Sequence, residues 1–232
     1  MKIKNYVCGL GLSLCAVSAS SEIVDVNISN LTQGIYFTPI LIAAHNSDAY
    51  IYHLGEEASP DMAALAEGGD ISGVSLAITS AGGVVMENPA GGMLAPATYT
   101  TAMDFDTGEM GYLSIAAMVL PTNDGFVGLD SWPIPSTAGT YTLYLNAYDA
   151  GSEANDEIVN GGGAPGVAGI PINPGADGGV DATGVTNTET NDKVHVHRGV
   201  LGDTDLEGGP SDLDSRIHRW LNPVAKVVVT VK

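Results

Sequence analysis

The sequence predicts an all-β fold, namely an antiparallel β-sandwich with one or two short helices and a long glycine-rich loop. Short runs of alternating apolar and polar residues recur at roughly ten-residue spacing and are separated by Gly, Pro and Asn turns. The 232-residue chain contains 30 glycines and only 15% charged residues, a balance that favours tight turns over a helical bundle. Hydrophobic residues make up 44% of the chain, enough for a sizeable core.

The first 19 residues have the pattern of an export signal. Lys2 and Lys4 precede an apolar stretch over residues 6–17, which ends in a small-residue cleavage motif. The apolar stretch is short for a membrane span. Both cysteines lie in this segment, so its removal leaves neither a disulfide nor a thiol. We therefore expect a secreted, periplasmic or cell-surface protein with one domain over residues 20–232.

The charge of the chain restricts its partners. Eight basic and 27 acidic residues give a formal net charge of −19. Nucleic acids and anionic membranes are themselves polyanions, so this balance argues against both. It suits extracellular solubility and the binding of divalent cations or basic surfaces. We expect no membrane insertion after the signal is cleaved.

Alternation of apolar and polar residues predicts strands along most of the chain. The run at residues 112–120 is the most apolar and is expected to be central. Pro39 lies inside another run and indicates an edge position or a bulge, because proline cannot donate to a ladder. The predicted strands cover residues 23–30, 35–44, 49–54, 74–79, 84–87, 98–103, 112–120, 126–129, 141–148, 193–200 and 224–231.

One helix is predicted near residue 60, and one long loop after residue 160. Ser59 is an N-cap candidate, Pro60 suits the first helical position, and two glycines at 68–69 end a helix of about two turns. Residues 211–221 are expected to form one or two helical turns. Residues 161–184 are rich in Gly, Pro, Asn and Asp, and predict a long mobile loop.

An acidic segment follows the predicted strand at residues 141–148. The segment at 147–157 reads AYDAGSEANDE, which places four acids and one asparagine within nine positions. Calcium takes six to eight oxygen ligands, commonly from loops that a sheet holds in place. A solvated acidic turn explains the same composition, so the residues alone leave both interpretations open.

The chain contains Asn-Asp-Gly-Phe-Val-Gly-Leu-Asp at 123–130, followed by Tyr-Asp-Ala-Gly-Ser-Glu at 148–153. These motifs, in this order, resemble the pattern of the spondin N-terminal domain, which occurs in F-spondin and mindin of animals and in exported bacterial proteins. Bacterial members share further segments, and the resemblance covers approximately residues 26–231. These further segments are Pro-Thr-Asn-Asp at 121–124, the acidic segment at 147–157, His-x-His-Arg-Gly at 195–199 and Asn-Pro-Val-Ala at 222–225.

The resemblance implies a sandwich akin to a C2 domain that binds Ca²⁺ through Asp124, Asp149 and Glu153. Turns at one end of a sandwich converge in space, so these three acids are expected to meet. Glu153 departs from the aspartate of the animal proteins by one methylene, but glutamate is an ordinary calcium ligand.

Two other patterns offer metal-site hypotheses. His195 and His197 alternate on a predicted strand, which places both imidazoles on one face, where they could ligate zinc or copper. A hydrogen-bonded strand face explains the same pair. The acids spaced along residues 203–214 mimic an EF-hand loop, but Pro210 and the lack of a preceding helix favour a solvated acidic loop.

The predicted function is a secreted or surface-exposed calcium-binding module that mediates adhesion or other extracellular binding. Its partner would be an unidentified extracellular protein or glycan. No Gly-x-Ser-x-Gly, His-Glu-x-x-His or phosphate-loop motif is present, so we expect no enzymatic activity. Two alternatives stay open: an extracellular hydrolase that uses the acidic loop cluster, or a zinc or copper protein that uses the two histidines.

Overall fold

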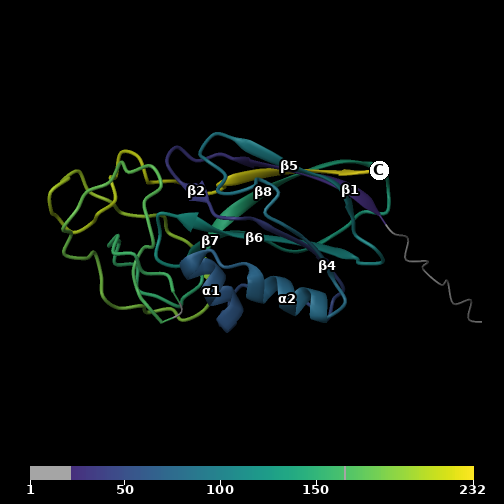
Figure 1. Ribbon diagram of the computed structural model, residues 1–232, viewed down its shortest axis with the longest axis horizontal. Coiled ribbons are helices and arrows are strands. Elements are labelled where there is room, and N and C mark those ends of the chain that lie inside the picture. The colour runs from purple at the N-terminus through teal and green to yellow at the C-terminus, as the bar shows by residue number, and fades with distance from the viewer. Residues whose placement is uncertain (1–21, 165) are drawn as a thin grey trace, which may run out of the picture.

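A computed structural model describes residues 22–164 and 166–232, so the predicted signal peptide lies outside the described residues. Strands dominate the chain and two short helices interrupt them (Figure 1). The elements are β1 (Ile23–Asn30), β2 (Tyr36–Phe37), β3 (Leu41–His45), α1 (Pro60–Gly68), α2 (Ser72–Ser80), β4 (Val84–Glu87), β5 (Tyr99–Asp106), β6 (Tyr112–Leu120), β7 (Gly125–Pro133), β8 (Gly139–Asp149), β9 (His195–Val196) and β10 (Ala225–Val231).

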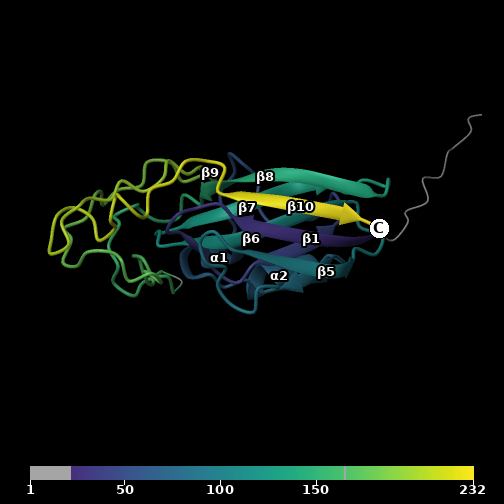
Figure 2. The same ribbon diagram turned by 90° about the horizontal axis from the view of Figure 1, so that it is seen from above.

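The strands of the described residues form one nearly closed sheet. Its order is β4-β3-β6-β7-β8-β10-β1-β5, with β2 paired to β6 and β9 paired to β8. Every ladder between named strands is antiparallel. The sheet folds over, so that the layer of β1, β5, β8 and β10 faces a layer that contains β6 and β7 (Figure 1 and Figure 2). β3 pairs with β6 and belongs to the second layer. The predicted all-β antiparallel fold is confirmed.

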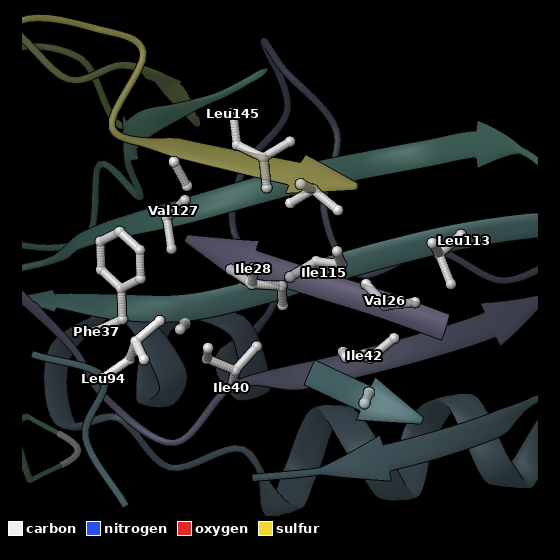
Figure 3. Packing of buried hydrophobic residues seen from close by; sticks show 14 of the residues in the cluster. Val26, Ile28, Phe37, Ile40, Ile42, Leu94, Leu113, Ile115, Val127 and Leu145 are labelled. Carbon is white, nitrogen blue, oxygen red and sulfur yellow. The ribbon is translucent and has the colours of Figure 1, made fainter. Parts of the chain in front are cut away.

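The core lies between the two layers and follows from the alternation in the sequence. In β1, Val24, Val26 and Ile28 are buried while the residues between them face outward. Its neighbour β10 repeats the pattern with its valines, because side chains on a strand alternate between the two faces. Figure 3 shows Val26 and Ile28 of β1 next to Ile115 from the opposite layer, in a cluster that also contains Val127.

The helices cover the outer face of β3 and β6. Met62 and Leu65 of α1 and Ile78 of α2 pack on a second cluster that includes Leu41 and Phe126. All five residues of β3 are buried, because this strand is covered on both faces. None of the helices in the described part of the chain is long and apolar enough to cross a bilayer.

The start of α1 confirms the predicted N-cap. The Ser59 hydroxyl accepts a hydrogen bond from the Met62 amide at 3.1 Å. We expect Ser59→Ala to lower the free energy of unfolding by about 1 kcal/mol, because the helix loses a partner for one of its first amides. Urea denaturation measures this loss. Ser80→Ala, at an exposed position at the end of α2, is the control. Equal stability of both variants would contradict the capping role.

The strand predicted at residues 74–79 is wrong, because this segment lies within helix α2. Val74 and Ile78 are four positions apart and both are buried, as expected for one face of a helix. Leu76 makes the same segment look alternating, but its side chain is 67% exposed. Over a run of six residues, the two-residue period of a strand and the 3.6-residue period of a helix predict nearly the same apolar positions.

Other predicted boundaries also differ from the structure. The strand at 35–44 is divided into β2 and β3 around Pro39, which lacks the amide that a continuous ladder needs. Residues 49–54 form bends, and adjacent Ile51 and Tyr52 are both buried, which an alternating strand would not allow. The strand predicted at 193–200 shortens to β9, and residues 211–221 form turns without a helix.

Candidate cation site at the ends of β7 and β8

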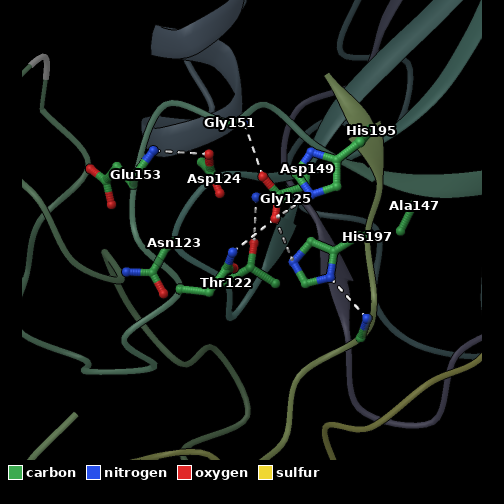
Figure 4. Close-up of polar contacts among 12 residues, drawn as sticks. Thr122, Asn123, Asp124, Gly125, Ala147, Asp149, Gly151, Glu153, His195 and His197 are labelled. Carbon is green, nitrogen blue, oxygen red and sulfur yellow. Dashed lines mark hydrogen bonds and ion pairs between the residues drawn. The ribbon is translucent and has the colours of Figure 1, made fainter. Parts of the chain in front are cut away.

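The site lies where β7 begins and β8 ends. Gly125 pairs with Asp149 in the β7–β8 ladder, and the Ala150 amide donates to the Asp124 carbonyl at 3.2 Å. Asp124 and Asp149 are far apart along the chain, but this pairing places them side by side (Figure 4). The predicted convergence of these two acids is therefore present in the structure.

Asp124 is fully buried, and one of its two carboxylate oxygens has hydrogen-bond partners while the other has none. Its Oδ2 accepts from the Ser152 amide at 2.8 Å, the Ser152 hydroxyl at 3.2 Å and the Glu153 amide at 3.1 Å. Its Oδ1 is buried without a hydrogen-bond partner. Burial, followed by repulsion from Asp149, raises the pKa of the Asp124 carboxyl to about 7, although these three bonds oppose the shift.

Asp149 is held by the turn that follows β8. Its Oδ1 accepts from the Gly151 amide at 2.9 Å, and its Oδ2 accepts from Asn155 Nδ2 at 2.8 Å. Gly151 has a φ of +70°, and a Cβ there would lie 2.6 Å from the Asn191 carbonyl oxygen. Only glycine fits that close approach, which explains the glycine in the Asp-Ala-Gly sequence.

The Glu153 side chain points away from the two aspartates. Its backbone amide binds Asp124, but its Oε2 accepts from the Gly169 amide at 3.1 Å on the other side of the turn (Figure 4). Burial is the main cause that raises the pKa of the Glu153 carboxyl to about 7, and the nearby Glu67 adds to it. The structure thus brings together two of the three predicted acids.

Two histidines approach Asp149, a contact that the sequence analysis did not predict. The Oδ2 atom of Asp149 lies 3.8 Å from His195 Nε2 and 4.0 Å from His197 Nε2. His195 pairs with Asp149 in the β8–β9 ladder, and the His197 amide donates to the Ala147 carbonyl at 3.1 Å. His197 is buried, and burial lowers its pKa to about 4. The sequence signals for this pair were its period-two spacing and the His-x-His-Arg-Gly segment, and neither indicated a contact with Asp149.

Glu157 organises the loops beside the site, a role that the sequence analysis also missed. This buried carboxylate accepts from the Leu201 amide at 2.6 Å, the Gly202 amide at 2.9 Å and the Ser211 hydroxyl at 2.6 Å. Asp212 holds the loop predicted at 161–184 in a similar way. The Asp212 carboxylate accepts from the Val159 amide, just before this loop, and from the Ala182 amide near the end of the loop. The long loop is therefore tied to buried acids.

The acids at 203–214 form no metal-binding group among the described residues, although Asp203 and Asp214 pair in a β-bridge. Asp203 accepts from the Asp205 and Ser211 amides, and Asp205 accepts from the Glu207 amide. Asp214 forms an ion pair with Arg216, with 2.6 Å between Oδ2 and the guanidinium. Both carboxylate oxygens of Asp203 and of Asp214 are thus already engaged within residues 203–216.

The residues around Asp124 match the needs of a hard cation in part. Within residues 22–164 and 166–232, no group of three or more His, Cys, Asp or Glu side chains is arranged to hold a metal ion. Two adjacent carboxyl groups, one with an unpaired buried oxygen, nevertheless form a site where two negative charges are unfavourable unless a cation compensates them. A cavity of about 250 Å³, lined partly by Ala150, Gly151 and Ser152, lies against the same turn.

Comparison with known proteins identifies one relationship. A family model described as Spondin_N matches residues 29–157. This range includes Asp124, Asp149 and Glu153 and ends before His195 and His197. No curated protein matches the chain.

Proposed function

The chain belongs to the spondin N-terminal domain family, and from this membership and the geometry of the site we propose that it is a secreted or surface-exposed module that binds calcium. Calcium would stabilise the turns at one end of the sandwich. These turns, with the loops attached to them, would then contact an extracellular protein or glycan and so mediate adhesion.

One observation carries the proposal: Asp124 Oδ1 is buried, unpaired and next to Asp149. An ionised carboxylate pair in such a place is costly unless a positive charge compensates it. A divalent cation that both carboxylates bind would remove the repulsion and supply the missing partner. Oxygen ligands of this kind are those that calcium prefers.

Asp124 and Asp149 would be the first two ligands, and Glu153 the third. Glu153 must exchange its bond to the Gly169 amide for the ion, a small change because its backbone already lies at the site. Its raised pKa shows that the present surroundings stabilise its charge poorly. Backbone carbonyls and water would complete the six to eight oxygens that calcium requires.

A thermal melt with and without calcium tests this proposal. A ligand that binds only the folded state stabilises it, by about 2.7 kcal/mol at a hundredfold excess over Kd. We expect the melting temperature to rise with calcium and to return to its starting value with a chelator. His197→Ala is expected to retain this calcium response. A melting temperature that neither calcium nor chelator changes would refute the proposal.

Without metal, the free energy of unfolding is expected to fall as the pH rises, because of Asp124. Burial and the neighbouring Asp149 raise the pKa of Asp124 in the folded state to about 7, above its ordinary value of 3.8, so the folded state holds this proton more tightly. The resulting stabilisation is complete below about pH 4 and is lost as pH rises towards 7. Burial lowers the pKa of His197 from 6.5 to about 4, so the unfolded state binds this proton more tightly. His197 therefore makes the free energy of unfolding rise with pH between about pH 4 and pH 6.5, which opposes the effect of Asp124.

The Asp124 contribution is therefore measured as the difference in unfolding free energy between the natural chain and Asp124→Asn. That difference should shift in favour of the variant between about pH 5 and pH 8. Calcium must displace the same proton, so its stabilising effect should be larger at the higher pH. A difference that does not change with pH would show that Asp124 is ionised throughout.

The adhesion part of the proposal needs a partner that depends on calcium. We expect capture of a component of the extracellular milieu by the natural chain in calcium, and its loss with a chelator or in Asp149→Asn. The hydrolase alternative has less support, because Asp124 and Asp149 are both buried and present no exposed carboxylate pair to a substrate.

A further inference from the structure

Asp149 faces a second group of donors on the side away from Asp124. Figure 4 shows Asp149 between Asp124 and His195, while His197 approaches the same carboxylate from below. His195 belongs to β9, which the β8–β9 ladder holds in register with Asp149, and His197 directly follows β9. Nitrogen and oxygen donors from separate parts of the chain thus meet around one carboxylate oxygen, Asp149 Oδ2.

The hydrogen bond of His195 shows which of its nitrogens is free. Its Nδ1 lies 2.8 Å from the Lys193 carbonyl oxygen, which can only accept, so Nδ1 carries the proton of the neutral ring. Nε2 then presents a lone pair towards Asp149 Oδ2, 3.8 Å away. This distance is too long for a hydrogen bond. Two electron-rich atoms that face each other in this way are stabilised by a cation between them.

His197 has the opposite arrangement. Its Nδ1 accepts from the Gly199 amide at 2.9 Å, so in the neutral ring Nε2 carries the proton. That Nε2 is buried, has no hydrogen-bond partner and lies 4.0 Å from Asp149 Oδ2. His197 is therefore a positioning residue that directs an N–H towards the carboxylate, and not a metal ligand. The hypothesis of a metal held by both histidines does not fit this geometry.

We propose that Asp149 Oδ2 and His195 Nε2 form a mixed oxygen–nitrogen site for Zn²⁺ or Cu²⁺, beside the oxygen site proposed for calcium. Imidazole nitrogen favours these ions, whereas calcium prefers oxygen. The inference shares Asp149 with the proposed calcium site but does not require calcium to bind.

The surroundings of His195 allow such an ion to enter. Its side chain is 32% exposed, so the ring can move and water can complete the coordination. Bonds of about 2.0–2.2 Å to zinc place two tetrahedral ligands about 3.3 Å apart. A shift of the ring of roughly half an ångström towards Asp149 is therefore sufficient.

The test uses the mature protein without a histidine tag. Calorimetric titration with Zn²⁺ measures affinity, and electron paramagnetic resonance with Cu²⁺ detects nitrogen coupled to the metal. We expect the natural chain to bind zinc and to show nitrogen coupling. In His195→Ala zinc binding should weaken at least tenfold and the coupling should disappear, while the calcium-dependent shift in melting temperature persists. His53→Ala is the matched control, because His53 is also partly exposed and contacts a carboxylate, Asp130, at 2.9 Å.

The possible outcomes separate this inference from the calcium proposal. Equal zinc affinity in His195→Ala and the natural chain, or a copper spectrum without nitrogen coupling, would overturn the nitrogen–oxygen site. A loss as large in His53→Ala would overturn it as well. Neither result affects the calcium proposal, which depends on the calcium response of the natural chain and of Asp124→Asn.

Discussion

Asp124→Asn is expected to abolish the calcium-dependent rise in melting temperature. The amide has nearly the shape of the carboxylate, and its oxygen can still accept from the Ser152 and Glu153 amides. Its Nδ2 group, placed where Oδ1 now lies, can donate towards Asp149. The variant therefore loses the charge that calcium requires, but keeps the bonds that hold the turn.

The same reasoning predicts that this variant without metal is at least as stable as the natural chain at about pH 8, because the repulsion between Asp124 and Asp149 is removed. Thermal melts with calcium and with chelator measure both effects. Asp48→Asn, at an exposed position, is the matched control and should retain the full calcium response. Glu153→Gln should lose only part of it. An undiminished response in Asp124→Asn would rule out Asp124 as a ligand.

Among the substitutions proposed for this chain, Glu157→Ala is expected to cause the largest decrease in the free energy of unfolding. The substitution leaves three donors without their acceptor, namely the Leu201 and Gly202 amides and the Ser211 hydroxyl. The Ser211 hydroxyl is buried and the two amides are partly buried. A buried donor left unpaired costs about 1–3 kcal/mol, so the total loss should be roughly 3 kcal/mol. Urea denaturation measures the loss. Hydrogen exchange should show that the amides of residues 201–202 lose protection first.

Glu189→Ala is the matched control for this prediction. Glu189 lies in an exposed loop, and its carboxylate accepts from the neighbouring Thr190 and Asn191 amides. Its removal should change the free energy of unfolding by no more than about 0.5 kcal/mol. If Glu157→Ala behaved in the same way, water would be replacing the carboxylate, and Glu157 would not organise the loop.

Local patterns predicted much of the fold because their causes are local. The predicted bounds at 23–30, 84–87 and 112–120 match β1, β4 and β6. The limits of α1 follow from a hydroxyl cap at one end and a glycine with φ +73° at the other. Residues 74–79 were assigned to a strand because a two-turn helix and a strand share too many apolar positions to be distinguished.

The candidate site was predictable only where it depends on the ends of adjacent strands. Asp124 and Asp149 meet because β7 and β8 pair. The sequence analysis predicted the meeting, but not this pairing, from the convergence of turns at one end of a sandwich. The direction of the Glu153 side chain depends on Gly169, and the position of His195 depends on β9 pairing with β8 across a long loop. Such contacts join residues far apart in the chain, and no local pattern reports them.

By itself, the sequence determined the strand-rich architecture, the capped helix, the acidic character and the family to which the chain belongs. These properties depend on side-chain periodicity, backbone preferences and charge, each of which is a property of neighbouring residues. The tertiary structure alone decided that Asp124 is buried with an unpaired oxygen and that Asp149 faces histidines. The reason is that burial and electrostatic repulsion depend on which distant segments pack together, and they in turn set the pKa and the affinity for a cation.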